Sequence, residues 1–284
     1  TPKAMANWGF DYESIKARKP EIIMLSSCLM GQTGPMNMYP GFGNLAGALS
    51  GFYEITGWPD RPPSGPFLAY TDYTAPRFTV SALMAALDHQ RRTGEGCYID
   101  LSQHESALHL LGPALLDQEI NERTATRSAN WSERHNVHGV YPVKGEDRWI
   151  AIVCQDQTAE DNLALLMGSQ KLDDSAIAAW TAQQDRFELQ QLLQNHGIAA
   201  HIATDSIDAV ADPQLAHRNH FRRVPQAYAG ETVVEGSHYQ LSRTPSDVLW
   251  GGPPIGEHTF EVLSEMLGYD GDKIADLAAV EALY

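Results

Sequence analysis

Apolar residues in the first part of the chain follow two different spacings, and each spacing predicts one kind of element. The segment 21–26, with four apolar residues in a row at its centre, has the length of a buried strand, and a loop rich in Gly and Pro extends from it to Phe42. Leu45, Leu49 and Phe52 recur at helical spacing and predict one helix over 44–55. Four prolines exclude regular structure from 57–66.

A second, strongly patterned helix is predicted over 74–93. Thr74 has the character of an N-cap, Pro76 suits a first helical turn, and Gly94 is able to end the helix. The apolar stripe of this helix consists of Val80, Leu83, Met84 and Leu87. A strand at 98–101 and a helix that starts with a capping box at Ser102 and runs to about Leu116 follow. Strands that alternate with helices predict an open α/β domain.

The pattern changes after Asn121, which divides the chain into parts. We predict a first part of a large α/β domain at 1–121, a polar linker at 122–136, a small α+β domain at 137–204, and a return linker with the last part of the large domain at 205–284. The small domain is expected to contain strands at 140–142, 149–154 and 198–202 with helices at 158–167 and 185–196. Two short strands and two terminal helices are expected after Asp212.

Composition describes an ordinary globular protein with an excess of acid. Hydrophobic residues make up 43% and charged residues 20%, and 36 Asp and Glu against 20 Lys and Arg give a net charge of −16. This balance repels nucleic acid and anionic membranes, so we expect neither as a partner. The chain has three cysteines at wide spacing, Cys28, Cys97 and Cys154, which favours free thiols in a reducing cytoplasm. It begins at Thr1 rather than Met, so we expect it to be a piece of a longer chain.

Asp72 is the residue with the most chemical interest. It stands in Tyr70-Thr71-Asp72-Tyr73, just ahead of the second predicted helix. An aspartate at a helix start is most often a cap. A carboxylate held in a pocket acts instead as a base or a nucleophile. The flanking tyrosines favour the pocket.

Several short segments, in order along nearly the whole chain, resemble the class III CoA-transferases. This family includes formyl-CoA transferases, carnitine CoA-transferases and the α-methylacyl-CoA racemases. The segments are 21–27, Gly31-Gln32-Thr33-Gly34-Pro35, Pro40-Gly41-Phe42, Thr56-Gly57-Trp58-Pro59-Asp60, Thr71-Asp72-Tyr73, Arg91-Arg92-Thr93-Gly94-Glu95-Gly96, Asp100-Leu101-Ser102, 241–245 and Gly256-Glu257-His258-Thr259.

The resemblance implies a fold, a reaction and an assembly. The fold is a discontinuous, Rossmann-like large α/β domain with a small inserted domain, in dimers whose chains interlock. The family's N-terminal segment, which contributes to binding the CoA nucleotide, has no counterpart here. The substrates are an acyl-CoA and a small carboxylic acid, a CoA thioester is the substrate, and no tightly bound cofactor is implied. The partner is an identical or a related chain.

The resemblance also implies roles for individual residues. Asp72 is the nucleophile, which forms a mixed anhydride and then an aspartyl-CoA thioester. Gln32 is the side-chain candidate for stabilising the negative charge of the intermediates, or it only stiffens its loop. Backbone groups of Leu29, Met30 and Gly31 are candidates for contact with the thioester or the pantetheine arm. The glycine-rich flap of some members is reduced here to Gly139.

Fewer residues support the prediction of the substrate and the choice among alternative functions. The loop around Leu29 to Gln32 and the run from Tyr70 to Arg77 look most like the branch that uses succinyl-CoA and benzylsuccinate. Phe42 and Tyr73 then belong to the substrate pocket. Racemisation needs a second base, and Phe42-Gly43 supplies none where racemases carry it. A non-catalytic scaffold subunit is the other alternative.

Metal binding is not indicated. The pairs His135-x-x-His138 and His217-x-x-His220 have a spacing seen in metal sites, but neither has further ligands nearby in sequence. We therefore expect no metal.

Overall fold

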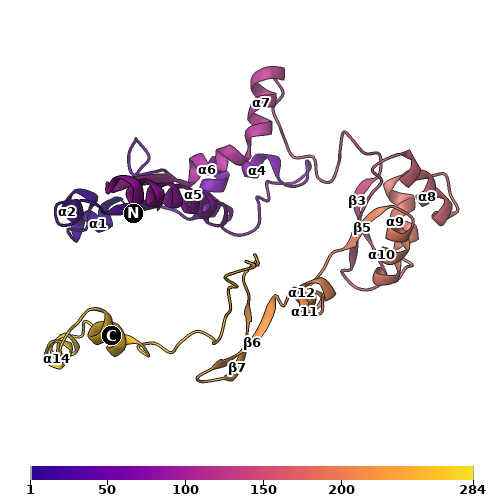
Figure 1. Ribbon diagram of the computed structural model, residues 1–284. Helices are drawn as coiled ribbons and strands as arrows, with labels where there is room; N and C mark the ends of the chain where they lie inside the picture. The colour runs from indigo at the N-terminus through magenta and orange to yellow at the C-terminus, as the bar shows by residue number, and fades with distance from the viewer. Residues whose placement is uncertain (1, 284) are drawn as a thin grey trace. The chain divides into compact units, whose positions relative to one another are not determined.

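The computed structural model describes residues 2–283, which form two compact units divided between His201 and Ile202 (Figure 1). The first unit begins with two short helices, α1 (Pro2–Asn7) and α2 (Tyr12–Lys16). Asp11 caps α2 by accepting a hydrogen bond from the Ser14 amide at 3.0 Å.

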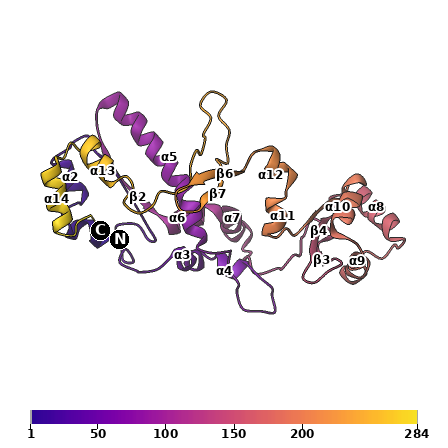
Figure 2. The ribbon, with the colours of Figure 1, turned by 90° about the horizontal axis from the view of Figure 1, so that it is seen from below.

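Two parallel strands, β1 (Ile23–Cys28) and β2 (Cys97–Ser102), form the sheet of the first unit's N-terminal half. Parallel neighbours require a crossover. The crossover consists of α3 (Gly43–Leu49), α4 (Phe52–Ile55) and α5 (Tyr70–Thr93), and α5 packs against both strands (Figure 2). Register is continuous from Ile23 opposite Cys97 to Cys28 opposite Ser102. Both predicted strands are confirmed.

Close packing at the start of β2 leaves room only for glycine. A Cβ atom at Gly96 would overlap the Ile22 carbonyl oxygen and the carbonyl group of Glu21. The side-chain amide of Gln90, in the last turns of α5, also donates to the Glu21 carbonyl. The end of α5 is therefore tied to the segment that leads into β1.

Three predicted helices differ from the structure in their limits. Gly51, with φ +98°, separates α3 from α4 where one helix was predicted. The helix after β2 is likewise two, α6 (Gln103–Leu110) and α7 (Gly112–Asn121), because Pro113 lacks the N–H that would continue α6. The helix predicted to start at Thr74 begins at Tyr70, with Ala69 as its N-cap, and so contains Pro76 in its interior.

A three-stranded sheet of order β3-β4-β5 lies in the second half of the first unit. It consists of β3 (His138–Pro142), β4 (Trp149–Val153) and β5 (Ala199–Ile202). Its helices are α8 (Gln157–Met167), α9 (Asp174–Thr181), which the sequence pattern had not predicted, and α10 (Arg186–Asn195). Each of these helices has an aspartate N-cap that accepts a backbone hydrogen bond, Asp156, Asp173 or Asp185.

The largest buried apolar cluster joins this sheet to its helices. Ile150 and Ile152 of β4 are fully buried, whereas the intervening Ala151 is exposed, as the two-residue period of a strand requires. They pack with fully buried side chains of the helices, Leu163, Ile177, Leu189 and Leu193. The cluster lies wholly within Val137–Ile198. The predicted domain boundaries remain a prediction.

The second unit contains short elements. Two helices that the sequence pattern had not predicted, α11 (Ser206–Val210) and α12 (Pro213–His217), precede the antiparallel pair β6 (Phe221–Gln226) and β7 (Gly230–Glu235). Near the end of the chain α13 (Thr259–Glu261) continues into the π-helical turn η1 (Val262–Met266), and α14 (Gly271–Ala279) follows. The predicted pair of strands and the helical end are confirmed.

The buried cluster predicts a large difference between two leucines of α8. Leu163 is 0% exposed and Leu165 is 74% exposed. We expect Leu163→Ala to lower the free energy of unfolding by about 2–5 kcal/mol, because it removes buried apolar surface and leaves a cavity. The matched control, Leu165→Ala, should change it by less than about 0.5 kcal/mol. Urea unfolding followed by circular dichroism measures both, and equal effects would contradict the assigned core.

The Cys154 thiol predicts a loss of stability at high pH. Burial raises its pKa from 9.0 to about 11, with Glu160 and Asp156 acting in the same direction. Between those two pH values the folded protein holds a proton that the unfolded chain loses, so stability falls as the pH rises through this window. Urea unfolding at pH 8 and pH 10.5 should show a smaller decrease for Cys154→Ala than for the wild type. An identical decrease would contradict this assignment.

Candidate active site

Asp72 lies in the first turn of α5, as its third residue. Its carboxylate Oδ2 accepts a hydrogen bond of 3.2 Å from the backbone N–H of Gly43, the first residue of α3. The carboxylate is therefore beside the first turns of two helices, where amide groups are free and the helix dipole favours negative charge. Among residues 2–283 the other oxygen, Oδ1, has no hydrogen-bond partner and Asp72 has no ion pair.

Gly43 has no side chain for a steric reason. A Cβ atom at this position would lie 2.8 Å from each of three atoms, the Asp72 Cγ, the Asp72 backbone nitrogen and the Ala69 carbonyl oxygen. Any larger residue would therefore push α3 away from the first turn of α5. The close approach of the two helices depends on this glycine.

Asp72 borders a cavity of about 380 Å³ at the end of β1. The cavity is lined by the end of β1 and the residue after it, by the loop 37–42 that leads to α3, and by Gln103 at the start of α6. Apolar side chains face it together with the carboxylate, namely Leu29, Met38, Tyr39 and Phe42. Phe42 is 77% exposed, so the cavity opens to the surface.

Of the residues predicted for the site, Leu29 and Phe42 line this cavity with Asp72, whereas Met30, Gly31 and Tyr73 do not. Tyr73 follows Asp72 in the helix and is 59% exposed. The structure thus brings part of the predicted set together around the carboxylate. The roles assigned to these residues remain predictions.

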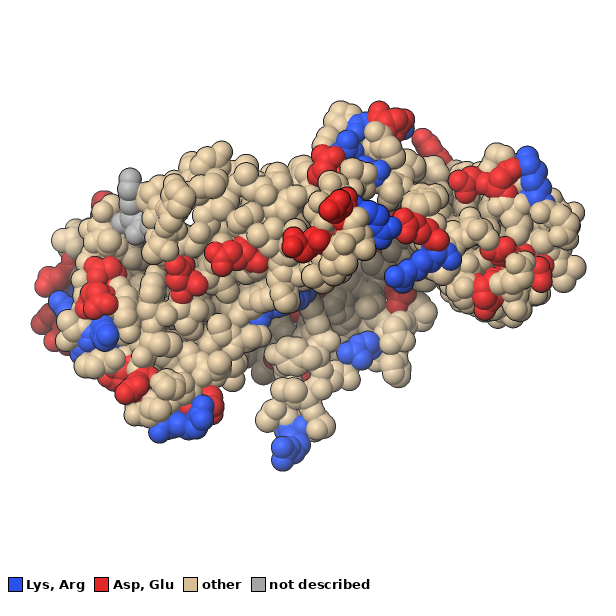
Figure 3. All heavy atoms as spheres, turned by 90° about the horizontal axis from the view of Figure 1, so that it is seen from above, with Lys and Arg blue, Asp and Glu red and all other residues tan. Residues whose placement is uncertain are grey.

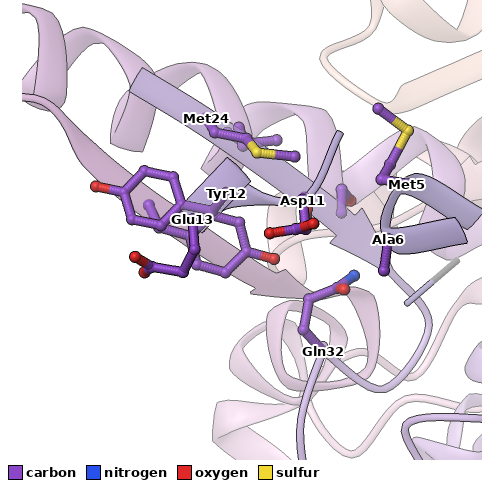
Figure 4. A pocket seen from close by; sticks show the side chains of 11 residues that line it. Met5, Ala6, Asp11, Tyr12, Glu13, Met24 and Gln32 are labelled. Atoms are coloured by element: carbon purple, nitrogen blue, oxygen red, sulfur yellow. The ribbon is translucent and has the colours of Figure 1, made fainter. Parts of the chain in front are cut away.

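Gln32 lies next to a different cavity. Its backbone N–H donates to both carboxylate oxygens of Asp100, at 2.9 and 3.0 Å, which ties its loop to β2. Its side-chain amide donates to Cys28 Sγ at 3.4 Å. Figure 4 shows this side chain at a cavity of about 500 Å³ that Asp11 and Tyr12 also line. Ser27 lines both cavities, and Cys28, which borders the Asp72 cavity, accepts from Gln32.

Thr71 and Gln103 belong to the site and were not predicted. The Thr71 side chain is 0% exposed, and its Oγ1 lies 3.0 Å from the Gly43 carbonyl oxygen and 3.0 Å from Gln103 Oε1. It therefore links α3, α5 and α6 directly beside Asp72. The residues come from distant parts of the sequence, and only the parallel pairing of β1 and β2 brings them together.

The described part of the chain shows neither a metal-binding cluster nor a membrane-spanning helix. No group of three or more His, Cys, Asp and Glu side chains there is arranged to hold a metal ion. Within the same residues, no helix has both the length and the apolar character needed to cross a bilayer. On the face shown in Figure 3, acidic residues are spread widely and the described Lys and Arg form no continuous area.

Comparison with known proteins gives a consistent result. The sequence is 28% identical to succinyl-CoA–D-citramalate CoA-transferase of Chloroflexus aurantiacus, over 98% of this chain and 73% of that protein. It is also 28% identical to the beta subunit of succinyl-CoA–L-malate CoA-transferase of the same organism, over 97% of this chain and 73% of the relative.

A solved structure agrees in fold. The crystal structure of a CAIB/BAIF family protein from Brucella suis matches with a TM-score of 0.82 and 24% identity, over 93% of this chain and 73% of that one. This similarity confirms the predicted α/β class. The model of CoA-transferase family III matches residues 1–259. The chain therefore belongs to the class III CoA-transferases, and it is a CoA-transferase.

Proposed function

We propose that this chain transfers CoA from succinyl-CoA to a carboxylic acid through an aspartyl-CoA thioester on Asp72. The observation that supports this most is the state of the carboxylate. Oδ2 is held by the Gly43 amide, Oδ1 has no partner among the described residues, and Asp72 lines a cavity that is open to the surface. A fixed carboxylate with one free oxygen suits nucleophilic attack.

The reaction consists of two acyl exchanges on Asp72, and each passes through an anhydride. Asp72 Oδ1 attacks the thioester carbonyl carbon, the C–S bond breaks, and the CoA thiolate departs. The product on Asp72 is a mixed anhydride. The thiolate then attacks the Asp72 carbonyl carbon, which releases succinate and leaves the aspartyl-CoA thioester. The acceptor carboxylate attacks this thioester and releases the CoA thiolate, and a second anhydride forms between Asp72 and the acceptor. The thiolate then attacks the acceptor carbonyl carbon of this anhydride. Acceptor-CoA leaves and the Asp72 carboxylate is restored. Every step exchanges activated acyl groups, so covalent catalysis divides one difficult transfer into easier ones.

The site and the relatives favour different acceptor acids. Relatives named for D-citramalate, L-malate and glutarate favour a small dicarboxylic acid. The apolar side chains of Met38, Tyr39 and Phe42 in the cavity favour an aromatic succinate such as benzylsuccinate. We place small dicarboxylic acids first and benzylsuccinate second, and a comparison of kcat/KM for the two acids decides between them.

We also propose that the chain works in an assembly with an identical or a related chain, in the cytoplasm. On α5 the predicted apolar stripe is only partly covered, since Val80 is 58% and Met84 is 56% exposed. On α7 the exposed side chains include Leu115, Leu116 and Ile120. Exposed apolar helix faces of this kind favour a protein partner. Relatives named as alpha and beta subunits support a related chain, and three free thiols support a reducing compartment.

Racemisation is the less favoured reaction at this site. It requires a second group that exchanges a proton on the opposite face of the α-carbon. Gly43, which lies against Asp72, contributes only its backbone N–H. A scaffold role without chemistry remains the alternative that the next experiment separates.

The covalent intermediate gives the first test of this proposal. The purified assembly is incubated with succinyl-CoA, quenched with hydroxylamine and analysed by peptide mass spectrometry. We expect a hydroxamate on Asp72, because hydroxylamine captures an activated aspartyl group. Asp72→Asn should form none and should lower turnover by at least about a thousandfold, since the nucleophile is lost.

Asp88→Asn is the matched control. Asp88 is an exposed carboxylate of the same helix, paired with Arg92 at 2.8 Å, and we expect its loss to leave turnover unchanged. An unmodified Asp72 in an assembly that still turns over succinyl-CoA would assign the chemistry to another chain and leave this one a scaffold.

The contact at Gly43 gives a second test. Gly43→Ala should lower the rate of adduct formation more than about tenfold, because the added methyl group displaces the first turn of α3 from Asp72. The control is Gly47→Ala in the same helix, where the nearest atom to an added Cβ is 3.8 Å away. Single-turnover kinetics measures both variants. Equal rates in Gly43→Ala and the wild type would contradict the role of this contact.

A further inference from the structure

Gln103 is one of the polar side chains that share the Asp72 cavity, with Ser27 and Asn37, and it has no part in the reaction scheme above. It is the first residue of α6 and follows the end of β2 directly. Its side chain is half-buried and lines the cavity together with Asp72. Parallel pairing of Cys28 with Ser102 brings the start of α6 to the edge of the sheet where the cavity lies.

The hydrogen bond to Thr71 determines which end of the Gln103 amide remains available. A threonine hydroxyl has a single proton to donate. The Gly43 carbonyl belongs to the first turn of α3, where the helix itself supplies a donor four residues later. Thr71 Oγ1 lies 3.0 Å from both the Gly43 carbonyl oxygen and Gln103 Oε1. Because the Gly43 carbonyl has the helical donor as well, we assign the single Thr71 proton to Gln103 Oε1. This arrangement leaves the two N–H groups of Gln103 Nε2 without a hydrogen-bond partner among the residues that the structure describes.

We propose that Gln103 donates a hydrogen bond from Nε2 to the acyl carbonyl oxygen on which Asp72 acts, and that Thr71 positions it for this role. The inference rests on the proposed function. Attack by Asp72 on a thioester converts the carbonyl oxygen into an oxyanion, which a preorganised donor stabilises more strongly than the ground state. Gln103 is catalytic in this scheme, whereas Thr71 is a positioning residue.

Gln32, the residue predicted for this task from the sequence, is less suited to it in the structure. Its side-chain amide already donates to Cys28 Sγ at 3.4 Å, and it lines the neighbouring cavity rather than that of Asp72. Gln103 has the same chemistry, a free donor and the correct cavity. The comparison therefore favours Gln103 as the donor for the oxyanion.

The test measures how fast Asp72 becomes acylated in the purified assembly. Succinyl-CoA is mixed with the protein in rapid-quench single turnovers, hydroxylamine stops the reaction, and mass spectrometry follows the hydroxamate on Asp72. Gln103→Met keeps the length of the side chain but has no donor. We expect it to lower the acylation rate about a hundredfold, the typical loss for one oxyanion donor, with little change in KM.

A second variant separates the chemistry from folding. Gln103→Glu keeps an oxygen that accepts from Thr71 but loses the donor and adds a negative charge beside Asp72, so its acylation should be slower still. Thr71→Val should lower the rate and Thr71→Ser should retain it, because serine keeps the hydroxyl. The control, Gln191→Met on the exposed face of α10, should act like the wild type. Thermal melting of each variant reports whether it is folded.

The outcomes distinguish this inference from the proposed function. A folded Gln103→Met variant that acylates Asp72 at the wild-type rate would overturn the role of Gln103 and leave the proposed function intact. Absence of the adduct in the wild type would overturn both. If neither Gln103 variant melts as a folded protein, Gln103 acts through folding, and the inference is wrong.

Discussion

The approach of α3 to the first turn of α5 is the contact on which the geometry of the site depends. Because Gly43 has no side chain, its amide comes within 3.2 Å of the Asp72 carboxylate and its carbonyl within 3.0 Å of the Thr71 hydroxyl. The backbone of one residue, Gly43, thus contacts both the carboxylate and the buried residue beside it. Beside this contact lies the cavity that Asp72 and the end of β1 line. The Asp72 carboxylate is therefore placed by packing rather than by a charged partner.

The two parallel strands supply the frame for this contact. Their register places the ends of β1 and β2 at one edge, so the loop after β1 and the start of α6 meet there. The Ser102 hydroxyl lies 3.3 Å from the Leu29 carbonyl and also accepts from the Glu105 amide at 3.3 Å, which joins that loop to the first turn of α6. Ligand sites in open α/β sheets lie beyond the carboxyl ends of their strands, and this cavity follows that rule.

The local sequence predicted the strands and most helices, but not their exact limits. Thr74 and Pro76 are strong local signals for a helix start, and packing of the preceding turn against Gly43 extends α5 back to Tyr70. Asp72 was recognised because its surroundings resemble a family. Thr71 lies in a segment that resembles the family but was given no role, and Gln103 lies outside those segments. A threonine and a glutamine 32 residues apart are ordinary until the strand register brings them together. The local sequence pattern does not explain apolar helix faces that are exposed in the single chain, such as that of α7.

The partner of Asp72 has one more consequence. Active-site carboxylates are often held by lysine, arginine or histidine, and a histidine partner loses its charge close to neutral pH. Here the partner is a peptide N–H, which does not titrate at any pH at which the protein is folded. The anchoring of the Asp72 carboxylate is therefore independent of the protonation of any neighbouring side chain. It also requires no donor side chain to be held in one rotamer, because the donor belongs to the main chain.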